Sequence, residues 1–184
     1  MRSRSAWVFA GLMLLVCSTG AIAQGLKPWA GGAAPALELA DLDGAMHRLS
    51  EYQGKAILVN FWATWCEPCR AEMPSIERLR KSMEGKPFAV LAVNVGESGR
   101  VARGYAEKLP VNFSILLDRD GRVTRSWGAR ILPASFVIGP DGAIRYSYLG
   151  ELDWSGPDVR ERIEALMPKQ PERAAAPGPS TALR

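Results

Sequence analysis

Two cysteines three positions apart stand between a buried strand and a helix, and this arrangement constrains the fold more than any other feature. Residues 56–62 form a nearly unbroken apolar run, which is typical of a central strand covered on both faces. The turn that follows reads Cys66-Glu67-Pro68-Cys69. A helix is predicted next, from Glu67 to Met83, because apolar residues recur there at helical spacing: Met73, Ile76, Leu79 and Met83.

The rest of the chain alternates strands with helices, as expected for an α/β sheet covered by helices on its faces. A turn at Asp43-Gly44 predicts a small N-terminal hairpin, and Pro140-Asp141-Gly142 predicts a second one. The expected strands are 37–39, 46–49, 89–95, 114–117, 135–138 and 143–149, and the expected helices are 100–109 and 155–167. We predict one domain over residues 35–167.

Several side chains in these elements carry specific expectations. In the helix expected over 100–109, apolar residues stand four apart and would face the core. The last helix is expected to be capped by Ser155 and to turn its apolar residues inward. His47, the sole histidine, is expected to be an exposed strand residue without a partner. The inward residues are predicted to be Val101, Tyr105 and Leu109 in one helix and Val159, Ile163 and Leu166 in the other.

The two ends of the chain differ from the domain between them. Residues 1–23 have the pattern of a secretory signal: two arginines, an apolar run over 6–16, and Ala21-Ile22-Ala23 before the cleavage point. An uncleaved anchor and a lipid attached at Cys17 are the alternatives. Residues 24–34 are expected to form a flexible lead-in, and residues 168–184 a disordered tail.

Composition narrows the possible functions. The 184 residues carry a formal charge of +4, of which Arg2 and Arg4 belong to the signal, and no basic block suggests nucleic acid as a partner. Once Cys17 has left with the signal, the cysteines that remain are Cys66 and Cys69. A bridge over so short a loop adds little stability, so the pair is better explained by redox chemistry than by stapling.

Thiol–disulfide exchange needs an attacking thiolate and a second thiol that releases the mixed disulfide. We expect Cys66 to attack, because free N–H groups at a helix start favour an anion, and Cys69 to resolve the intermediate from a more buried place. Pro68 fits the first helical turn. Glu67 places a negative charge beside Cys66, which disfavours the thiolate and predicts a reducing couple. Trp65 is expected to be partly exposed beside a substrate groove.

Two further residues, Glu72 and Pro133, are compatible with either a role in the reaction or an ordinary structural position. Glu72 lies on the same helix face as the cysteines, where it could move a proton to or from Cys69, but it also suits a surface position early in a helix. Pro133 precedes a strand, and a cis bond there would bring the backbone of Leu132 against the disulfide. From the residues alone, the two readings of Glu72 stay open and trans is the expectation for Pro133.

Residues 57–74 read ILVNFWATWCEPCRAEMP, and this segment resembles the active-site segment of the TlpA/ResA-like thioredoxins, exported thiol–disulfide oxidoreductases. The likeness extends from about Ala33 to Leu166. It implies a thioredoxin-like fold with a central mixed sheet, an insertion over residues 96–117, and Cys66 and Cys69 as the redox pair.

The resemblance also implies roles for residues outside the motif. Pro133 matches a cis proline, and Leu132 before it matches a position that touches substrate, where many relatives have a smaller or polar residue. Glu72 matches the acidic residue that follows the motif in ResA-like members. Asn60 stands where ordinary thioredoxins carry a buried aspartate, so the loss of that acid fits a proton role for Glu72.

We therefore expect a periplasmic protein, free or membrane-anchored, that reduces disulfides in envelope proteins without a cofactor. A membrane thiol or electron donor protein would keep it reduced. Apocytochrome c before haem attachment is the leading substrate, because relatives with that activity share the pattern. The alternatives are a dithiol oxidase, a peroxidase, an inert binding protein, and a metal-binding module, for which two further ligands are missing.

Overall fold

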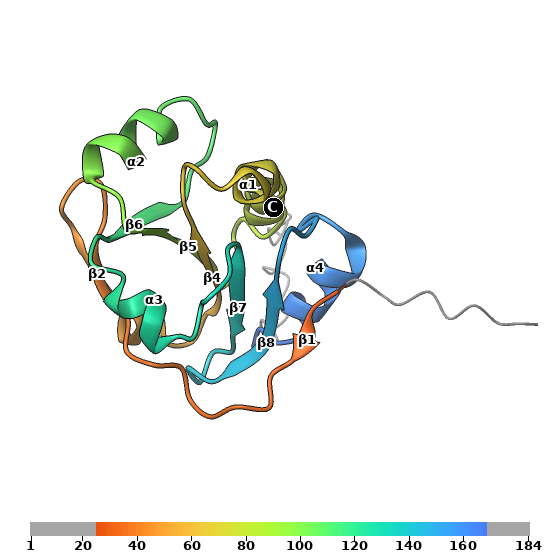
Figure 1. Ribbon diagram of the computed structural model, residues 1–184. Coiled ribbons are helices and arrows are strands. Elements are labelled where there is room, and N and C mark those ends of the chain that lie inside the picture. Colours follow the sequence, from red (N-terminus) through yellow and green to blue (C-terminus); the bar gives the residue numbers. More distant parts are fainter. Residues whose placement is uncertain (1–24, 169–184) are drawn as a thin grey trace, which may run out of the picture.

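The computed structural model describes residues 25–168, so the predicted signal, the lipid site at Cys17 and nearly all of the predicted tail lie outside the described residues. Between those limits the chain forms a mixed six-stranded sheet with helices on both faces and a separate two-stranded hairpin (Figure 1). This is the expected thioredoxin-like arrangement. In the same residues, no helix combines the length and apolar character needed to cross a membrane.

The large sheet has the strand order β1-β8-β7-β4-β5-β6. Strands β4, β5 and β6 run parallel to one another, whereas the pairs β4–β7, β7–β8 and β8–β1 are antiparallel. The strands are β1 (Lys27–Pro28), β4 (Ala56–Trp62), β5 (Phe88–Val95), β6 (Ser114–Asp118), β7 (Ala134–Ile138) and β8 (Ile144–Leu149). The predicted N-terminal hairpin is confirmed as β2 (Glu38–Ala40) paired with β3 (Met46–Arg48).

The helices cover the two faces unequally. They are α1 (Glu67–Ser82), α2 (Gly99–Ala106), α3 (Arg122–Ser126) and α4 (Pro157–Glu164), with a 3-10 turn η1 (Leu49–Tyr52). One buried cluster joins α1 and α4 to the sheet, and a second joins the hairpin and α3 to the opposite face (Figure 1). Neither α3 nor η1 was predicted, because segments of four or five residues show too little periodicity.

Strand β4 supplies side chains to both clusters, which explains its unbroken apolar sequence. Leu58 and Trp62 face α1, whereas Val59 and Phe61 face the other side. All seven residues of the strand are buried. Alternation along an extended chain sends successive side chains to opposite faces, so a strand in the middle of a covered sheet must be apolar on both. Its polar exception, Asn60, faces α1, where it binds Glu72.

The helix after the motif has the predicted core face. Met73, Ile76, Leu79 and Met83 are all buried, and the helix ends one residue earlier than expected. In α2 the prediction was partly wrong: Ala102 is buried there, whereas Val101 is 47% exposed. Helix α2 is shorter than the predicted helix, and the other two predicted inward residues, Tyr105 in α2 and Leu109 after it, are partly buried against the core.

The start of the last helix corrects another prediction. Helix α4 begins at Pro157 with Gly156 as its cap, and Ser155 instead donates to the Asp153 carboxylate at 2.6 Å. Proline favours the first helical turn because its missing N–H would have no partner there. Val159 and Ile163 face the core as predicted, and Leu166 is partly buried against it.

His47 corrects a third prediction, because it has partners and is half-buried. Its ring lies between the Asp41 carboxylate, 2.9 Å from Nε2, and the Tyr52 hydroxyl at Nδ1. These contacts tie strand β3 of the hairpin to the turn that follows β2 and to η1. No local pattern predicts this cluster, because its contacts depend on how the hairpin folds back.

The predicted flexible lead-in contains defined backbone pairing. Lys27 and Pro28 form β1 against the edge of β8, and Ala33 makes an isolated bridge to Ala143. Trp29 packs edge-on against Phe136, with ring centroids 5.7 Å apart. A two-residue strand among glycines and alanines has no period to detect, so composition suggested flexibility where the sheet edge provides partners.

The core face of α1 yields a stability prediction. Ile76→Ala should lower the free energy of unfolding by about 2–5 kcal/mol, because it removes a fully buried side chain and leaves a cavity. Val101→Ala, on the exposed face of α2, is the matched control and should change it by less than about 0.5 kcal/mol. Urea denaturation of both variants measures the difference, and equal losses would show that the packing is not as described.

Candidate functional site

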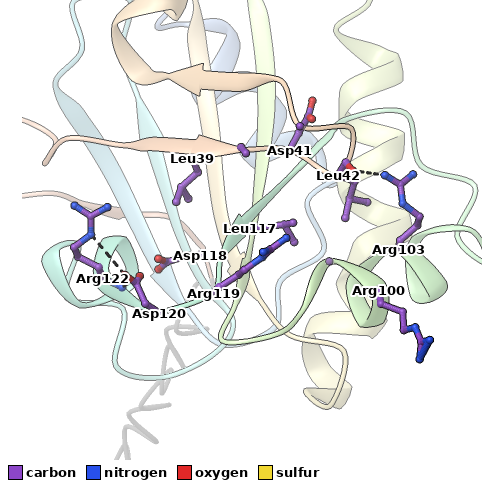
Figure 2. Close-up of a pocket in the computed structure, with 13 residues that line it drawn as sticks. Leu39, Asp41, Leu42, Arg100, Arg103, Leu117, Asp118, Arg119, Asp120 and Arg122 are labelled. Atoms are coloured by element: carbon purple, nitrogen blue, oxygen red, sulfur yellow. Dashed lines mark hydrogen bonds and ion pairs between the residues drawn. The ribbon is translucent and has the colours of Figure 1, made fainter.

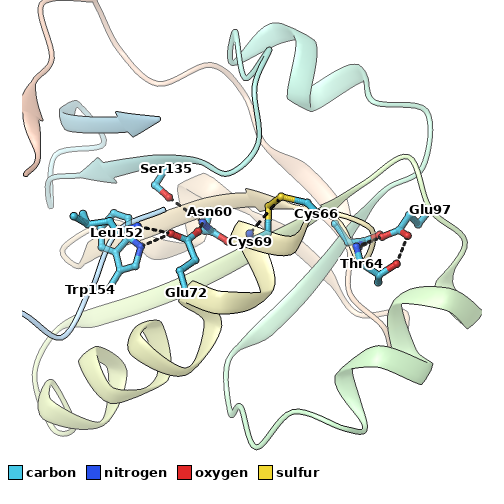
Figure 3. The surroundings of a disulfide bond; sticks show 10 residues. Asn60, Thr64, Cys66, Cys69, Glu72, Glu97, Ser135, Leu152 and Trp154 are labelled. Atoms are coloured by element: carbon cyan, nitrogen blue, oxygen red, sulfur yellow. Dashed lines mark hydrogen bonds between the residues drawn. A yellow bond between two sulfur atoms is a disulfide. The ribbon is translucent and has the colours of Figure 1, made fainter. Parts of the chain in front are cut away.

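The two motif cysteines form a disulfide at the junction of β4 and α1, as Figure 3 shows. Cys66 is the N-cap of α1, and its sulfur accepts the Cys69 N–H at 3.3 Å. Cys69 is fully buried, whereas Cys66 keeps 5% of its surface exposed. The helix therefore begins at the disulfide, and its free N–H groups point towards Cys66, where they would stabilise a thiolate.

The neighbours of the cysteines lie as the sequence predicts. Trp65 is 70% exposed, and Glu67 and Pro68 are exposed in the first turn of α1. The Leu132–Pro133 peptide bond is cis, as the family resemblance implied and the residues alone did not. Ala134 pairs with Phe61 between β7 and β4, so Pro133 lies at the end of β4 that leads into the motif.

Glu72 is buried beneath the motif with its carboxylate held by three donors (Figure 3). The Asn60 side-chain amide donates to Oε1 at 2.7 Å. The Leu152 backbone N–H at 3.2 Å and the Trp154 indole N–H at 3.0 Å both donate to Oε2. These contacts exclude the reading of Glu72 as a surface residue and place a titratable group one helical turn after Cys69.

Burial raises the pKa of Glu72 to about 7, because the ionised form loses its hydration. The hydrogen bonds from Trp154, Asn60 and Leu152 oppose this effect by stabilising the carboxylate, and the nearby charge of Glu151 adds to it. A carboxyl with a pKa near neutrality can both accept and release a proton at physiological pH, which is the property required of a proton-transfer group.

The segment that closes over Glu72 was not predicted from the sequence. Between β8 and α4, Trp154 is fully buried and its backbone N–H donates to Ser75 at 3.1 Å, while Ser75 also donates to the Leu152 carbonyl. Glu72 and Ser75 thus attach this segment to α1. No local signal marks Trp154 as part of the site, because its partners lie about eighty positions earlier in the chain.

Glu97 was also missed, although a signal for it existed. Its carboxylate accepts the Thr64 N–H at 2.8 Å and the Thr64 hydroxyl, and the Asn94 amide at 2.7 Å (Figure 3). Glu97 thereby fixes the loop that carries Trp65 to Cys66. Parallel strands β4 and β5 end at the same edge, so polar residues just after each strand are expected to meet there.

A cavity of about 540 Å³ lies elsewhere, between the hairpin, the start of α2 and the β6–α3 connection (Figure 2). Its charges are mixed: Arg103 binds the Leu42 carbonyl and the Asp43 carboxylate, and Arg122 faces Asp120. None of the predicted site residues lines it. Across residues 25–168, no three His, Cys, Asp or Glu side chains gather as they would around a metal ion.

The fold and the disulfide can now be compared with known proteins. The sequence profile of the AhpC/TSA family matches residues 30–147. The chain belongs to the AhpC/TSA family. Within it, the thiol-disulfide oxidoreductase ResA of Geobacillus thermodenitrificans (strain NG80-2) is 36% identical over 138 residues, which cover 75% of this chain and 78% of the relative.

Solved structures agree with this membership of the AhpC/TSA family. A protein of Chlorobium tepidum assigned as thiol:disulfide interchange protein DsbE superposes with a TM-score of 0.65 at 28% identity, covering 77% and 96% of the two chains. The exposed lipoprotein thioredoxin of Streptococcus pneumoniae strain TIGR4 gives 0.63 at 27% identity, covering 72% and 100%. This AhpC/TSA member is a ResA-like thiol–disulfide oxidoreductase with Cys66–Cys69 as its disulfide.

The raised pKa of Glu72 predicts how stability changes with pH. The unfolded chain ionises this group near 4.5 and the native protein near 7, so between these values the native state holds a proton that the unfolded state has lost. The free energy of unfolding should therefore fall by about 3 kcal/mol as pH rises through that window. Glu72→Gln should remove this decline in urea denaturation of the oxidised protein.

Glu77→Gln is the matched control on the same helix. Burial by itself would raise the pKa of Glu77, but the Arg80 guanidinium and the Asn112 N–H outweigh it and hold that pKa below its usual range. Its contribution to stability is present above the unfolded pKa and lost as pH falls, so this variant should keep the decline attributed to Glu72. The assignment fails if Glu72→Gln and the unsubstituted protein decline equally.

Proposed function

We propose that this oxidoreductase is an extracytoplasmic reductase, which passes electrons from a membrane thiol donor protein to disulfides in envelope proteins. The observation that carries the chemistry is the buried Glu72 carboxyl, held one helical turn from Cys69 with a pKa of about 7. Thiol exchange at neutral pH requires a proton to leave one thiol and another to be supplied, and Glu72 suits both steps.

The reaction starts from the reduced pair. The Cys66 thiolate attacks one sulfur of a substrate disulfide, whose S–S bond breaks as a mixed disulfide forms and the other substrate sulfur leaves as a thiolate. Cys69 then passes its proton to the Glu72 carboxylate, and its thiolate attacks the sulfur of Cys66. The second substrate sulfur leaves, so two electrons have moved to the substrate and the protein holds the Cys66–Cys69 disulfide. The donor protein reverses these steps.

The direction of electron flow follows from Glu67. This exposed carboxylate is the residue after Cys66 and the first of α1. A negative charge at that place opposes the stabilisation that the helix start gives to a thiolate, so it favours the oxidised pair relative to a protein with a neutral or cationic neighbour. A cysteine pair that readily becomes oxidised is a reductant. Pro68, the second residue between the two cysteines, fits the first turn of α1.

The surface around the disulfide suits an extended polypeptide. Leu132 makes no backbone hydrogen bond within residues 25–168, so its N–H and carbonyl are available to pair with a substrate strand. Exposed apolar side chains lie in neighbouring segments, Trp65 before Cys66 and Ile131 before Leu132, with Leu149 opposite Ala134 in the sheet. We assign substrate contact to Trp65, Leu132 and Pro133 on this basis.

The proposed location rests on the N-terminal sequence and on a similar protein, and the proposed substrate rests on the shared motif. Residues 1–23 have the pattern of a secretory signal, and the similar protein of Streptococcus pneumoniae is an exposed lipoprotein. Apocytochrome c is the proposed substrate because ResA-like members that act on it share the Trp-Cys-x-x-Cys segment. Its haem-binding segment has the pattern Cys-x-x-Cys-His, so its two cysteines can form the disulfide that would be reduced.

The reduction potential tests the direction. We expect the Cys66–Cys69 couple, equilibrated with defined thiol buffers, to have a midpoint near thioredoxin's value of about −270 mV and well below about −200 mV. Replacing the charge in Glu67→Gln should raise the midpoint. A value near about −120 mV, the range of a strong oxidant, would instead identify a disulfide donor.

The order of attack predicts different products from two variants. Cys69→Ser should accumulate a mixed disulfide with an oxidised Cys-x-x-Cys-His peptide, because no second thiol releases it, whereas Cys66→Ser should form almost none. Mass spectrometry of the quenched mixture identifies the linked cysteine. Linkage through Cys69 in the Cys66→Ser variant would reverse the assigned roles, and no linkage in either would remove this peptide class as substrate.

A further inference from the structure

The three groups that hold the Glu72 carboxylate are all donors. The Leu152 backbone N–H and the Trp154 indole N–H can only donate, and the Asn60 amide is placed with Nδ2 towards Oε1. This arrangement satisfies an ionised carboxylate. The protonated acid carries an O–H that must itself donate, so it needs an acceptor that neither Leu152 nor Trp154 can supply.

Asn60 carries that acceptor. Its residue is fully buried, and within residues 25–168 its Oδ1 is one of three buried side-chain polar atoms without a hydrogen-bond partner. A half-turn of the amide exchanges Oδ1 and Nδ2, which are nearly equal in size. The turned amide would place Oδ1 where Nδ2 now lies, 2.7 Å from Glu72 Oε1.

Ser135 can serve as a hydrogen-bond partner in both orientations of the amide. It lies opposite Asn60 in the β4–β7 pairing, and its hydroxyl oxygen is 2.9 Å from Asn60 Nδ2. A hydroxyl can accept or donate. In the observed orientation Nδ2 donates to Glu72 and to Ser135, and in the turned orientation Oδ1 accepts from both. Asn60 thus keeps two hydrogen bonds in either state.

We propose that the Asn60 side-chain amide inverts each time Glu72 gains or loses a proton, and that it is the positioning residue for proton transfer with Cys69. This inference rests on the proton role assigned above to Glu72. In the step, the Cys69 S–H bond breaks, an O–H bond forms on Glu72, and no electron is transferred. Around Glu72, the charged neighbour is Glu151 beside Leu152. Cys69 on α1 carries a proton only when the disulfide is reduced, and β4 and β7 contribute the neutral Asn60 and Ser135.

The inversion gives each protonation state of Glu72 a bonded partner inside the protein. If Glu72 had only hydrogen-bond donors around it, the carboxylate would be stabilised and the O–H of the protonated acid would have no acceptor. A two-way partner keeps both states accessible, so the proton can move at neutral pH in either direction.

Nuclear magnetic resonance of the oxidised protein with labelled asparagine tests the inversion directly. Between about pH 5 and 9, the Asn60 amide protons should lose their contact to the Ser135 methylene as Glu72 becomes protonated, with the same midpoint as the Glu72 carboxyl carbon. Asn94, whose amide binds Glu97, is the internal control and should not follow that midpoint. An Asn60 amide that keeps its contact to Ser135 while Glu72 titrates overturns the proposal.

A kinetic cycle tests the effect on exchange. Asn60→Leu, which keeps the size and removes both polar atoms, should slow resolution of the mixed disulfide at neutral pH about tenfold. In a Glu72→Gln background the same substitution should cause almost no further loss, since Asn60 acts through Glu72. Equal losses in the two backgrounds would show a merely structural role. Ser135→Ala removes one hydrogen bond from both orientations and leaves the partner Glu72 in place, so it should slow resolution less than Asn60→Leu. An equal slowing by both variants would show that disturbed packing, and not the amide, causes the loss.

The two levels of the proposal fail separately. The resonance experiment uses the unsubstituted protein and requires no substrate, so it reports the amide even if the protein reduces nothing in the envelope. A midpoint typical of an oxidant together with an inverting amide would reject the reductase and keep the role of Asn60. A reducing midpoint with a fixed amide would reject Asn60 and keep the reductase.

Discussion

The buried Glu72 carboxyl is the interaction on which the rest of the site depends. Burial of a titratable group is costly unless hydrogen bonds compensate, and here the donors come from β4 and from the segment between β8 and α4. These contacts fix the first turns of α1, and with them the disulfide. Burial by the same segments raises the pKa of Glu72 to about 7 against the opposing effect of these hydrogen bonds, so the anchoring of the helix and the shifted pKa have one physical origin.

The sequence predicted the central part of this structure well. The apolar run of β4 and the period of α1 are strong signals, because each continues over seven residues or more in a covered sheet. Cys66 and Cys69 were predicted as the disulfide pair because spacing and helix position are local properties.

What the sequence could not predict depends on contacts between distant segments. Glu72 alone was compatible with either a surface or a buried place, and only the fold brings Trp154 and Leu152 onto it. His47 looked partnerless because Asp41 and Tyr52 reach it only after the hairpin closes. The cis bond at Pro133 needed the family resemblance, since a proline before a strand does not specify its isomer.

The segment that closes over Glu72 has a consequence for the newly made chain. Cys66, Cys69 and Glu72 are neighbours in sequence and emerge together, but Leu152 and Trp154 are added some eighty residues later. Until that segment docks, Glu72 stands in water and ionises like any surface glutamate, so Cys69 has no proton partner tuned to neutral pH. The two thiols are therefore present before Glu72 is buried, and the raised pKa of Glu72 arises only with completion of the fold.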